Sequence, residues 1–150
     1  MDYSLAAPKL LVSDLARAST GASAARSPIT TIGALRFQRV WIQGVIVDWR
    51  GNSLALDDGS AIVELHFPDA EDKRSSKPGE LVLRALGVLL GFFLPGMYML
   101  IAGAYNPAEK KITVHKLVDL SSSPNAESFW SFEVIEAYHM FYKSQMDEPT

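Results

Sequence analysis

Two adjacent carboxylates and one histidine are the side chains whose types and spacing could carry general acid–base chemistry. Asp57 and Asp58 stand side by side, but Gly59 follows them, and an Asp-Gly pair favours a tight turn in which carboxylates hydrogen-bond the backbone. His66 lies two residues after Glu64, the spacing of an ordinary pair on the solvent-exposed face of a strand. We therefore interpret these residues as structural or surface residues.

Other residue types needed for catalysis, metals or cofactors are absent or scattered. The sequence contains no cysteine, which excludes a thiol nucleophile, a disulfide, an iron–sulfur centre and a cysteine-bearing zinc site. The remaining histidines, His115 and His139, are isolated, and neither a glycine-rich phosphate loop nor a nucleophile elbow occurs. We expect a protein that is not an enzyme, with no catalytic, metal-binding or cofactor-binding residues.

Length and composition favour a single folded domain with a binding or scaffold role. The chain has 150 residues, of which 48% are apolar, enough for a hydrophobic core. Lys and Arg total 14 against 17 Asp and Glu, and the net charge of −3 argues against an extended basic surface for nucleic acid.

Five apolar segments predict strands. The first alternates, with Val40, Ile42 and Ile46 on one face and Gly44 at its centre, where a bulge or sharp bend is expected. A long bent first strand, a meander, an insertion and a hairpin are typical of a five-stranded OB-fold barrel. Another small barrel or an open α+β sandwich is the alternative. The predicted strands are 37–48, 53–57, 60–67, 97–105 and 111–120.

The remaining segments are predicted as helices, a linker and a tail. Residues 9–15 fit a short strand or a short helix, and residues 16–34, rich in Ala, Ser, Thr and Gly, predict a flexible linker or loose loop. Residues 80–94 predict a buried helix, and residues 124–143 a C-terminal helix capped by Ser123. The expected division is 1–34 as a short element and linker, 35–143 as the OB-fold domain and 144–150 as a tail.

The apolar segment before the fourth predicted strand has a second interpretation. Residues 85–104 carry no charge and reach the length of a transmembrane helix. Pro95 and Gly96 in their middle predict a turn instead. We therefore expect no membrane span and keep a membrane-associated protein as a less favoured hypothesis.

The surface that many OB-folds use for nucleic acid lacks the necessary chemistry here. Such folds bind single strands through basic and aromatic side chains on the second and third strands. The corresponding surface has no aromatic residue, no lysine or arginine and two acids, so no nucleic-acid-binding residues are predicted. A single-stranded nucleic-acid-binding module remains the alternative function. The residues of this surface are Ser53, Ala55, Asp57, Ile62, Glu64 and His66.

The predicted C-terminal helix has more apolar residues than one barrel can cover. At about 100° per residue, Trp130, Val134, Ala137 and Phe141 form one stripe, which suffices for packing on a barrel. Leaving three or four further large side chains in water would forfeit roughly 1.5–3 kcal/mol each. A partner protein is therefore predicted to cover a second face. The further apolar residues are Phe129, Phe132, Ile135, Tyr138, Met140 and Tyr142.

Three stretches of the chain have a distinctive order and spacing. They are 40–47 (VWIQGVIV), 95–100 (PGMYML) and 116–121 (KLVDLS), the last continued by Pro124, 127–130 (ESFW) and 133–134 (EV). From about residue 37 to residue 142 the sequence resembles the RecQ-mediated genome instability protein 2 family.

The resemblance implies a small, non-catalytic, nuclear OB-fold protein. Members of that family bind the C-terminal OB domain of RecQ-mediated genome instability protein 1. The pair joins topoisomerase III to a RecQ helicase in a complex that dissolves double Holliday junctions without crossover. The pair resembles the two smaller OB subunits of replication protein A yet lacks their DNA-binding surface, so little or no direct DNA binding is implied.

The resemblance also nominates partner-binding residues. Trp130 and Val134 match the family motif, whereas Tyr138 and Phe141 continue the same stripe by periodicity. Trp41, on the outward face of the first strand, is a weaker candidate. The predicted partner-binding residues are Trp130, Val134, Tyr138, Phe141, Phe129 and Trp41.

One segment departs from the family pattern. Pro78-Gly79 and Pro95-Gly96 duplicate the approach to the fourth strand, and removing residues 80–96 would leave a sequence closer to the family. We interpret 80–96 as an insertion, either of a lineage or from unusual splicing.

Overall fold

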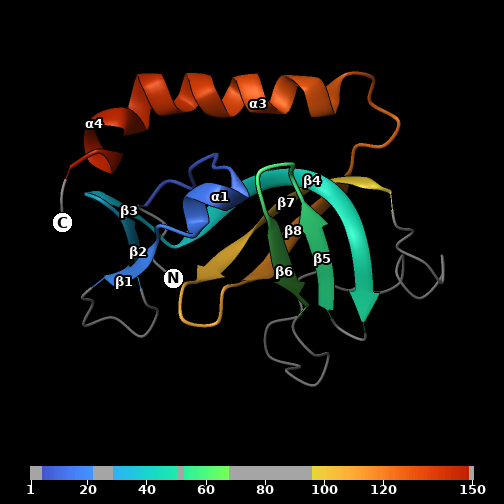
Figure 1. The fold of residues 1–150 in the computed structure, drawn as a ribbon, viewed down its shortest axis with the longest axis horizontal. Coiled ribbons are helices and arrows are strands. Elements are labelled where there is room, and N and C mark those ends of the chain that lie inside the picture. Colours follow the sequence, from blue (N-terminus) through green and yellow to red (C-terminus); the bar gives the residue numbers. More distant parts are fainter. Residues whose placement is uncertain (1–4, 22–28, 51–52, 68–95, 149–150) are drawn as a thin grey trace.

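The computed structural model describes residues 5–21, 29–50, 53–67 and 96–148. A five-stranded barrel lies beneath a long C-terminal helix, and a small sheet sits beside the barrel near the end of that helix (Figure 1). The helix therefore spans both sheets.

The barrel closes in the strand order β4-β5-β6-β8-β7. The strands of each neighbouring pair are antiparallel except β6 and β8, which run parallel. This is the order of an OB-fold, so the predicted fold class is confirmed, with strand bounds close to those expected. The bounds are β4 Arg39–Arg50, β5 Ser53–Asp57, β6 Ile62–His66, β7 Tyr98–Asn106 and β8 Lys111–Asp119.

Alternate side chains of the strands fill the barrel interior. Val40, Ile42 and Ile46, predicted on one face of the first strand, are all fully buried. The opposite face of β4 is covered only in part, since Val47 is 41% exposed. Other fully buried barrel residues are Leu54, Leu56, Leu65, Met99, Ile101 and Ile112.

β4 curves around the barrel and exchanges partners along its length. It pairs with β7 over its first half and with β5 over its second half, with a register shift between Ile46 and Asp48. A Cβ on Gly44 would lie 2.5 Å from Leu56 Cδ2 and 2.6 Å from the Asp57 carbonyl oxygen, so the two strands approach this closely only because the residue has no side chain. The irregularity therefore lies just after Gly44 rather than at it.

The sequence predicts a linker over 16–34, and the structure contradicts this in the parts it describes. β1 (Ser19–Gly21), β2 (Ile29–Ile32) and β3 (Leu35–Phe37) form an antiparallel sheet. Its apolar residues Ile32, Leu35 and Phe37 belong to the same buried cluster as the barrel core. The Ala-, Ser- and Thr-rich composition concealed β2, whose four β-branched residues favour a strand.

The segment 9–15, for which strand and helix were both open, contains elements of each. Lys9 forms a parallel bridge with Trp41, and the backbone N–H of Leu10 donates to the Trp41 carbonyl at 3.2 Å. α1 (Val12–Leu15) follows as a single helical turn. Leu10, Val12 and Leu15 are buried, so this segment packs against the barrel core.

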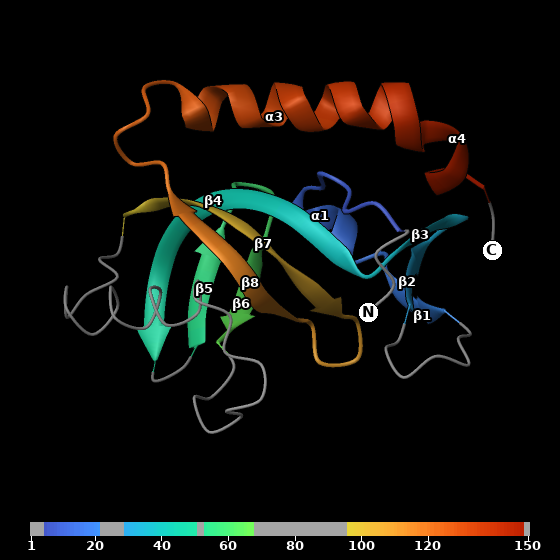
Figure 2. The same cartoon turned by 180° about the vertical axis from the view of Figure 1, so that it is seen from behind.

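The C-terminal helix consists of three consecutive parts. They are α3 (Ala126–Ala137), the π-helical turn η1 (Tyr138–Tyr142) and α4 (Lys143–Met146). Figure 2 shows the helix crossing above β4 and α1 and ending near β3. The predicted cap is wrong: Asn125, with φ of 67°, is the N-cap, and no side chain caps the helix. The backbone of Ser123 instead closes a turn onto the Leu120 carbonyl at 2.9 Å.

The end of the helix is fixed to the turn between β2 and β3. The Ala34 N–H donates to the Gln145 carbonyl at 2.7 Å, and Arg17 Nη2 donates to the Met146 carbonyl at 3.2 Å. Gly33 has φ of 57°, and a Cβ there would lie 2.5 to 2.9 Å from three carbonyl oxygens of this C-terminal segment. The close backbone contact therefore requires glycine.

Two predictions fall in the segment 68–95, outside the described residues. They are the helix over 80–94 and nearly all of the insertion 80–96. Among the residues that the structure describes, no helix has the length and apolarity needed to cross a membrane.

Candidate protein-interaction site

The inner face of α3 packs against the barrel. Trp130 and Val134 are each 4% exposed and Ala137 is 8% exposed. α3 contacts β4, and Trp130 shares a cavity wall with Val45 and Tyr98. Trp130 and Val134, predicted to bind a partner, thus pack within their own chain, and their role in partner binding stays a prediction.

The π-helical turn changes which residues face the barrel after residue 137. A π-turn adds about one residue per turn, so every later side chain is rotated back by about 100° relative to an unbroken α-helix. Phe141, predicted to continue the inner stripe, is therefore 61% exposed. Tyr142 and Met146 take the inner positions instead and contact the main core cluster, as Tyr138 does in part.

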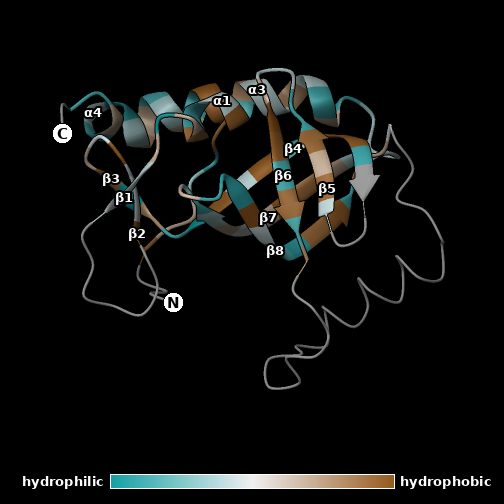
Figure 3. Ribbon diagram, turned by 60° about the horizontal axis from the view of Figure 1, so that its bottom comes forward, coloured by the Kyte–Doolittle hydropathy of each residue, from teal (hydrophilic) through white to brown (hydrophobic). Residues whose placement is uncertain are grey.

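The opposite face of the helix exposes a row of large apolar side chains, which we call the outer helix surface. Phe129, Phe132 and Ile135 follow at intervals of three residues and continue into the π-turn. Figure 3 shows hydrophobic and hydrophilic bands alternating along this helix. The members and their exposures are Phe129 59%, Phe132 68%, Ile135 51%, Met140 64% and Phe141 61%.

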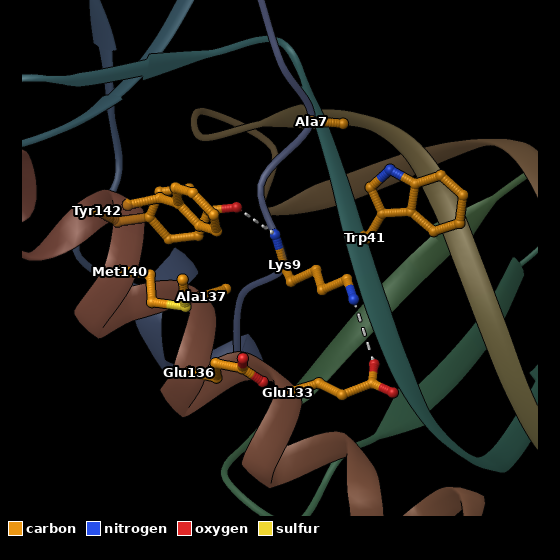
Figure 4. A pocket seen from close by; sticks show the side chains of 9 residues that line it. Ala7, Lys9, Trp41, Glu133, Glu136, Ala137, Met140 and Tyr142 are labelled. Carbon is orange, nitrogen blue, oxygen red and sulfur yellow. Dashed lines mark hydrogen bonds and ion pairs between the residues drawn. The ribbon is translucent and has the colours of Figure 1, made fainter.

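A groove opens between this helix, the N-terminal segment and β4. It has a volume of about 440 Å³, and Trp41, Ala137 and Met140 are among its lining residues. Figure 4 shows Lys9 in the middle of it, its Nζ 3.3 Å from Glu133 Oε2. Trp41, the weaker predicted candidate, therefore lines a groove at the edge of the outer helix surface.

The outward face of β5 and β6 is polar and internally paired. Ser53 Oγ donates to Glu64 Oε1 at 3.0 Å, and Lys111 Nζ lies 3.6 Å from the same oxygen. Ile62 is an exposed apolar side chain there, at 61%. For stacking a base, β5 and β6 offer only the His66 imidazole, because they contain no Phe, Tyr or Trp.

The adjacent carboxylates Asp57 and Asp58 hold a turn. Asp57 Oδ1 accepts the Gly59 N–H at 2.8 Å, and Asp58 Oδ1 accepts the Ser60 N–H at 2.9 Å. Asp58 Oδ2 also accepts the Val12 N–H at 2.7 Å, which ties α1 to the barrel. Among the described residues, no group of three or more His, Cys, Asp or Glu could hold a metal ion.

Tyr98 is a titratable group that lines a cavity with Glu127 and Trp130 of α3. Burial and, to a smaller extent, the negative charge of Glu127 on α3 raise the pKa of Tyr98 to about 12, because both disfavour the phenolate. Tyr98 therefore stays neutral at physiological pH and acts as a packing residue beneath the helix.

Three members of the outer helix surface were absent from the predicted partner-binding set. Phe132, Ile135 and Met140 are large and apolar, which the sequence shows, but periodicity places them beside or outside the inner stripe. Their exposure in the structure identifies them as part of the surface. The orientations of Met140 and Phe141 depend on the π-turn. No motif in the sequence signals that turn.

Two solved structures are similar in fold. A chain of the S. pombe Stn1–Ten1 complex superposes with a TM-score of 0.66 at 19% identity, covering 92% of this chain and 95% of that chain. A chain of a replication protein A heterotrimer bound to ssDNA superposes with a TM-score of 0.59 at 12% identity, covering 89% and 96%. At these identities the likeness shows the OB-fold alone. A comparison with curated proteins found no match.

The family comparison covers most of the chain. The model for RecQ-mediated genome instability protein 2 matches residues 6–138, a segment that includes the barrel strands and α3. With the OB-fold, this match supports a nucleic-acid- or protein-binding module. The chain belongs to the RecQ-mediated genome instability protein 2 family.

Proposed function

We propose that this chain is a non-catalytic OB-fold adaptor that stabilises a nuclear complex of a RecQ helicase and topoisomerase III. It binds the C-terminal OB domain of RecQ-mediated genome instability protein 1 and through it supports double Holliday junction dissolution, crossover suppression and DNA repair. The family membership supports this proposal. The observation that carries it is the outer helix surface, with five large apolar side chains each more than half exposed.

The energetics of that surface favour a protein partner. Burying one large apolar side chain contributes roughly 1.5–3 kcal/mol, and five such side chains exposed on one helix can form the apolar centre of an interface. A second helix from the partner fits such a row by ridges-into-grooves packing. Trp130 and Val134 already fill the side of the helix that faces the barrel. The partner protein therefore covers the apolar side chains of the outer helix surface, which the barrel does not reach.

A matched pair of isoleucine variants tests the assignment. Ile135 lies on the outer helix surface and is 51% exposed, whereas Ile62 on β6 is 61% exposed. Ile135→Asp should weaken binding of the full chain to the partner's C-terminal OB domain by about a hundredfold, because it places an uncompensated charge in an apolar contact. Ile62→Asp should bind as the wild type does.

The two variants also separate the alternatives. Wild-type affinity for Ile135→Asp would contradict the helix-centred adaptor, and a loss confined to Ile62→Asp would move the interface to β5 and β6. A titration of the free chain with a single-stranded oligonucleotide tests the nucleic-acid-binding alternative. Salt-sensitive binding at micromolar or lower concentration would favour that alternative, and the polar, partly acidic surface of β5 and β6 leads us to expect none.

A further inference from the structure

The groove beside the outer helix surface has two chemically different walls. Met140 and Ala137 form an apolar wall on the helix side, next to the carboxylates of Glu133 and Glu136. The other side is formed by Lys9 and the Trp41 ring. Because the groove also includes Phe141, it is continuous with the proposed partner-binding surface.

One negative charge in the groove lacks compensation. Lys9 Nζ lies 3.3 Å from Glu133 Oε2 and neutralises that carboxylate. Glu136 forms no ion pair within the described residues and stands one helical turn from Met140 (Figure 4). On the opposite wall, Lys116 Nζ already lies 5.6 Å from the centroid of the Trp41 ring.

We propose that this groove binds a basic side chain of the arginine type, presented by the partner protein beside the outer helix surface. The inference rests on the proposed function and adds to it the chemistry of one partner residue. The aliphatic stem of the arginine lies against Ala137 and Met140, and its guanidinium faces Glu136. A planar guanidinium suits this place because it can donate two hydrogen bonds to one carboxylate.

The charge arrangement decides between a basic and a purely apolar occupant. An apolar ring in the groove would remove water from Glu136 and return no hydrogen bond, which disfavours it. A carboxylate would meet Glu133 and Glu136 on the helix wall. A cation bound over Trp41 would repel Lys116, so the arriving charge is placed at the helix wall beside Glu136.

The test measures the affinity of the full chain for the C-terminal OB domain of RecQ-mediated genome instability protein 1. Glu136→Lys should weaken binding about tenfold at low salt, and Glu136→Gln should weaken it severalfold. The difference from wild type should shrink to about twofold in half-molar salt, since screening weakens partly exposed ion pairs. Glu109→Lys, an exposed carboxylate in the β7–β8 turn, makes the same change in net charge and should leave affinity unchanged.

Each outcome decides one hypothesis. Wild-type affinity for Glu136→Lys, with the complex intact, overturns the basic occupant while leaving the adaptor in place. Weakening by Met140→Ser with no effect of Glu136→Lys also overturns it and assigns an apolar occupant. Failure of the wild-type chain to bind the domain at all contradicts the proposed function itself. The comparison requires that Glu136→Lys and Glu109→Lys unfold at the same temperature. We expect this because both residues lie on the surface.

Discussion

The two faces of the C-terminal helix carry the same kinds of side chain and differ in what covers them. Trp130 and Val134 face the barrel and are each 4% exposed, whereas their neighbours Phe129 and Ile135 are 59% and 51% exposed. Apolar character alone therefore does not separate a residue that holds the fold from one that is available to a partner. The angular position of a residue around the helix axis decides which of the two faces it occupies. The π-turn changes that position for every residue that follows it.

The largest expected effect distinguishes the two faces by stability. Trp130→Ala should lower the free energy of unfolding by about 3–5 kcal/mol, because a buried ring leaves a cavity between helix and barrel. Phe129→Ala, one residue earlier, should change it by less than about 0.5 kcal/mol. Urea denaturation of the free chain measures both.

A third variant sharpens this comparison. The Trp130 indole Nε1 is buried and has no hydrogen-bond partner among the described residues. Trp130→Phe keeps most of the ring packing and removes that unsatisfied donor, so it should destabilise far less than Trp130→Ala. Equal losses for Trp130→Ala and Phe129→Ala would mean that the two faces are not distinct.

The next effect tests the π-turn. Inserting one alanine after His139 rotates every later side chain by about a further 100°, which turns Tyr142 and Met146 away from the core and should lower stability by about 2 kcal/mol. His139→Ala retains the chain length and serves as the control, since the side chain of His139 is exposed. If the insertion and the substitution unfold at the same urea concentration, the rotation of the helix does not determine which residues are buried.

The barrel and the helix could be predicted from sequence because their patterns are local. The alternation of Val40, Ile42 and Ile46 with other residues indicates a strand with one buried face. The Asp58-Gly59 pair indicates a turn, and neither pattern depends on distant parts of the chain. The small N-terminal sheet could not be predicted in this way. Its strands are short, and their burial depends on contacts with the distant barrel and the helix end.

The sequence indicated where the candidate site lies but not which of its residues are exposed. The excess of apolar residues on the helix correctly indicated a second exposed apolar face. The predicted anchors followed ideal periodicity and include Trp130 and Val134, which pack on the barrel, and Phe141, which the π-turn leaves exposed. Their roles in partner binding stay predictions. A π-turn arises from packing of its residues against the core, which no local pattern records.

A smaller effect concerns ionisation under the inner face. Tyr98 lines a cavity with Glu127 and Trp130, and its pKa is raised from 10.0 to about 12 by burial and then by Glu127. A raised pKa means that the neutral phenol stabilises the fold below about pH 10 and that this contribution is lost as the pH rises toward 12. The wild type should therefore lose stability over this interval more steeply than Tyr98→Phe, followed by tyrosinate absorbance and circular dichroism. Parallel pH profiles for the two proteins would contradict the burial of Tyr98 by the helix.

The smallest effect lies at the exposed end of the helix, just after the π-turn. Tyr138 Oη donates to Asp147 Oδ1 at 2.9 Å, and Lys143 Nζ lies 3.1 Å from Asp147 Oδ2. The hydrogen bonds from Lys143 and then Tyr138 lower the pKa of Asp147 below its usual value of 3.8. A lowered pKa means that the charged carboxylate stabilises the fold above pH 3.8 and that this contribution is lost as the pH falls through its folded-state pKa.

Asp147→Asn should therefore be slightly less stable than wild type at neutral pH and equal to it in strong acid. The difference should be small, because all three groups are in contact with solvent and exposed ion pairs contribute little. Glu148→Gln removes the same charge from the neighbouring residue and serves as the control. A difference between Asp147→Asn and wild type that persists unchanged into acid would mean that packing of Asp147, rather than its charge, holds the end of the helix after the π-turn.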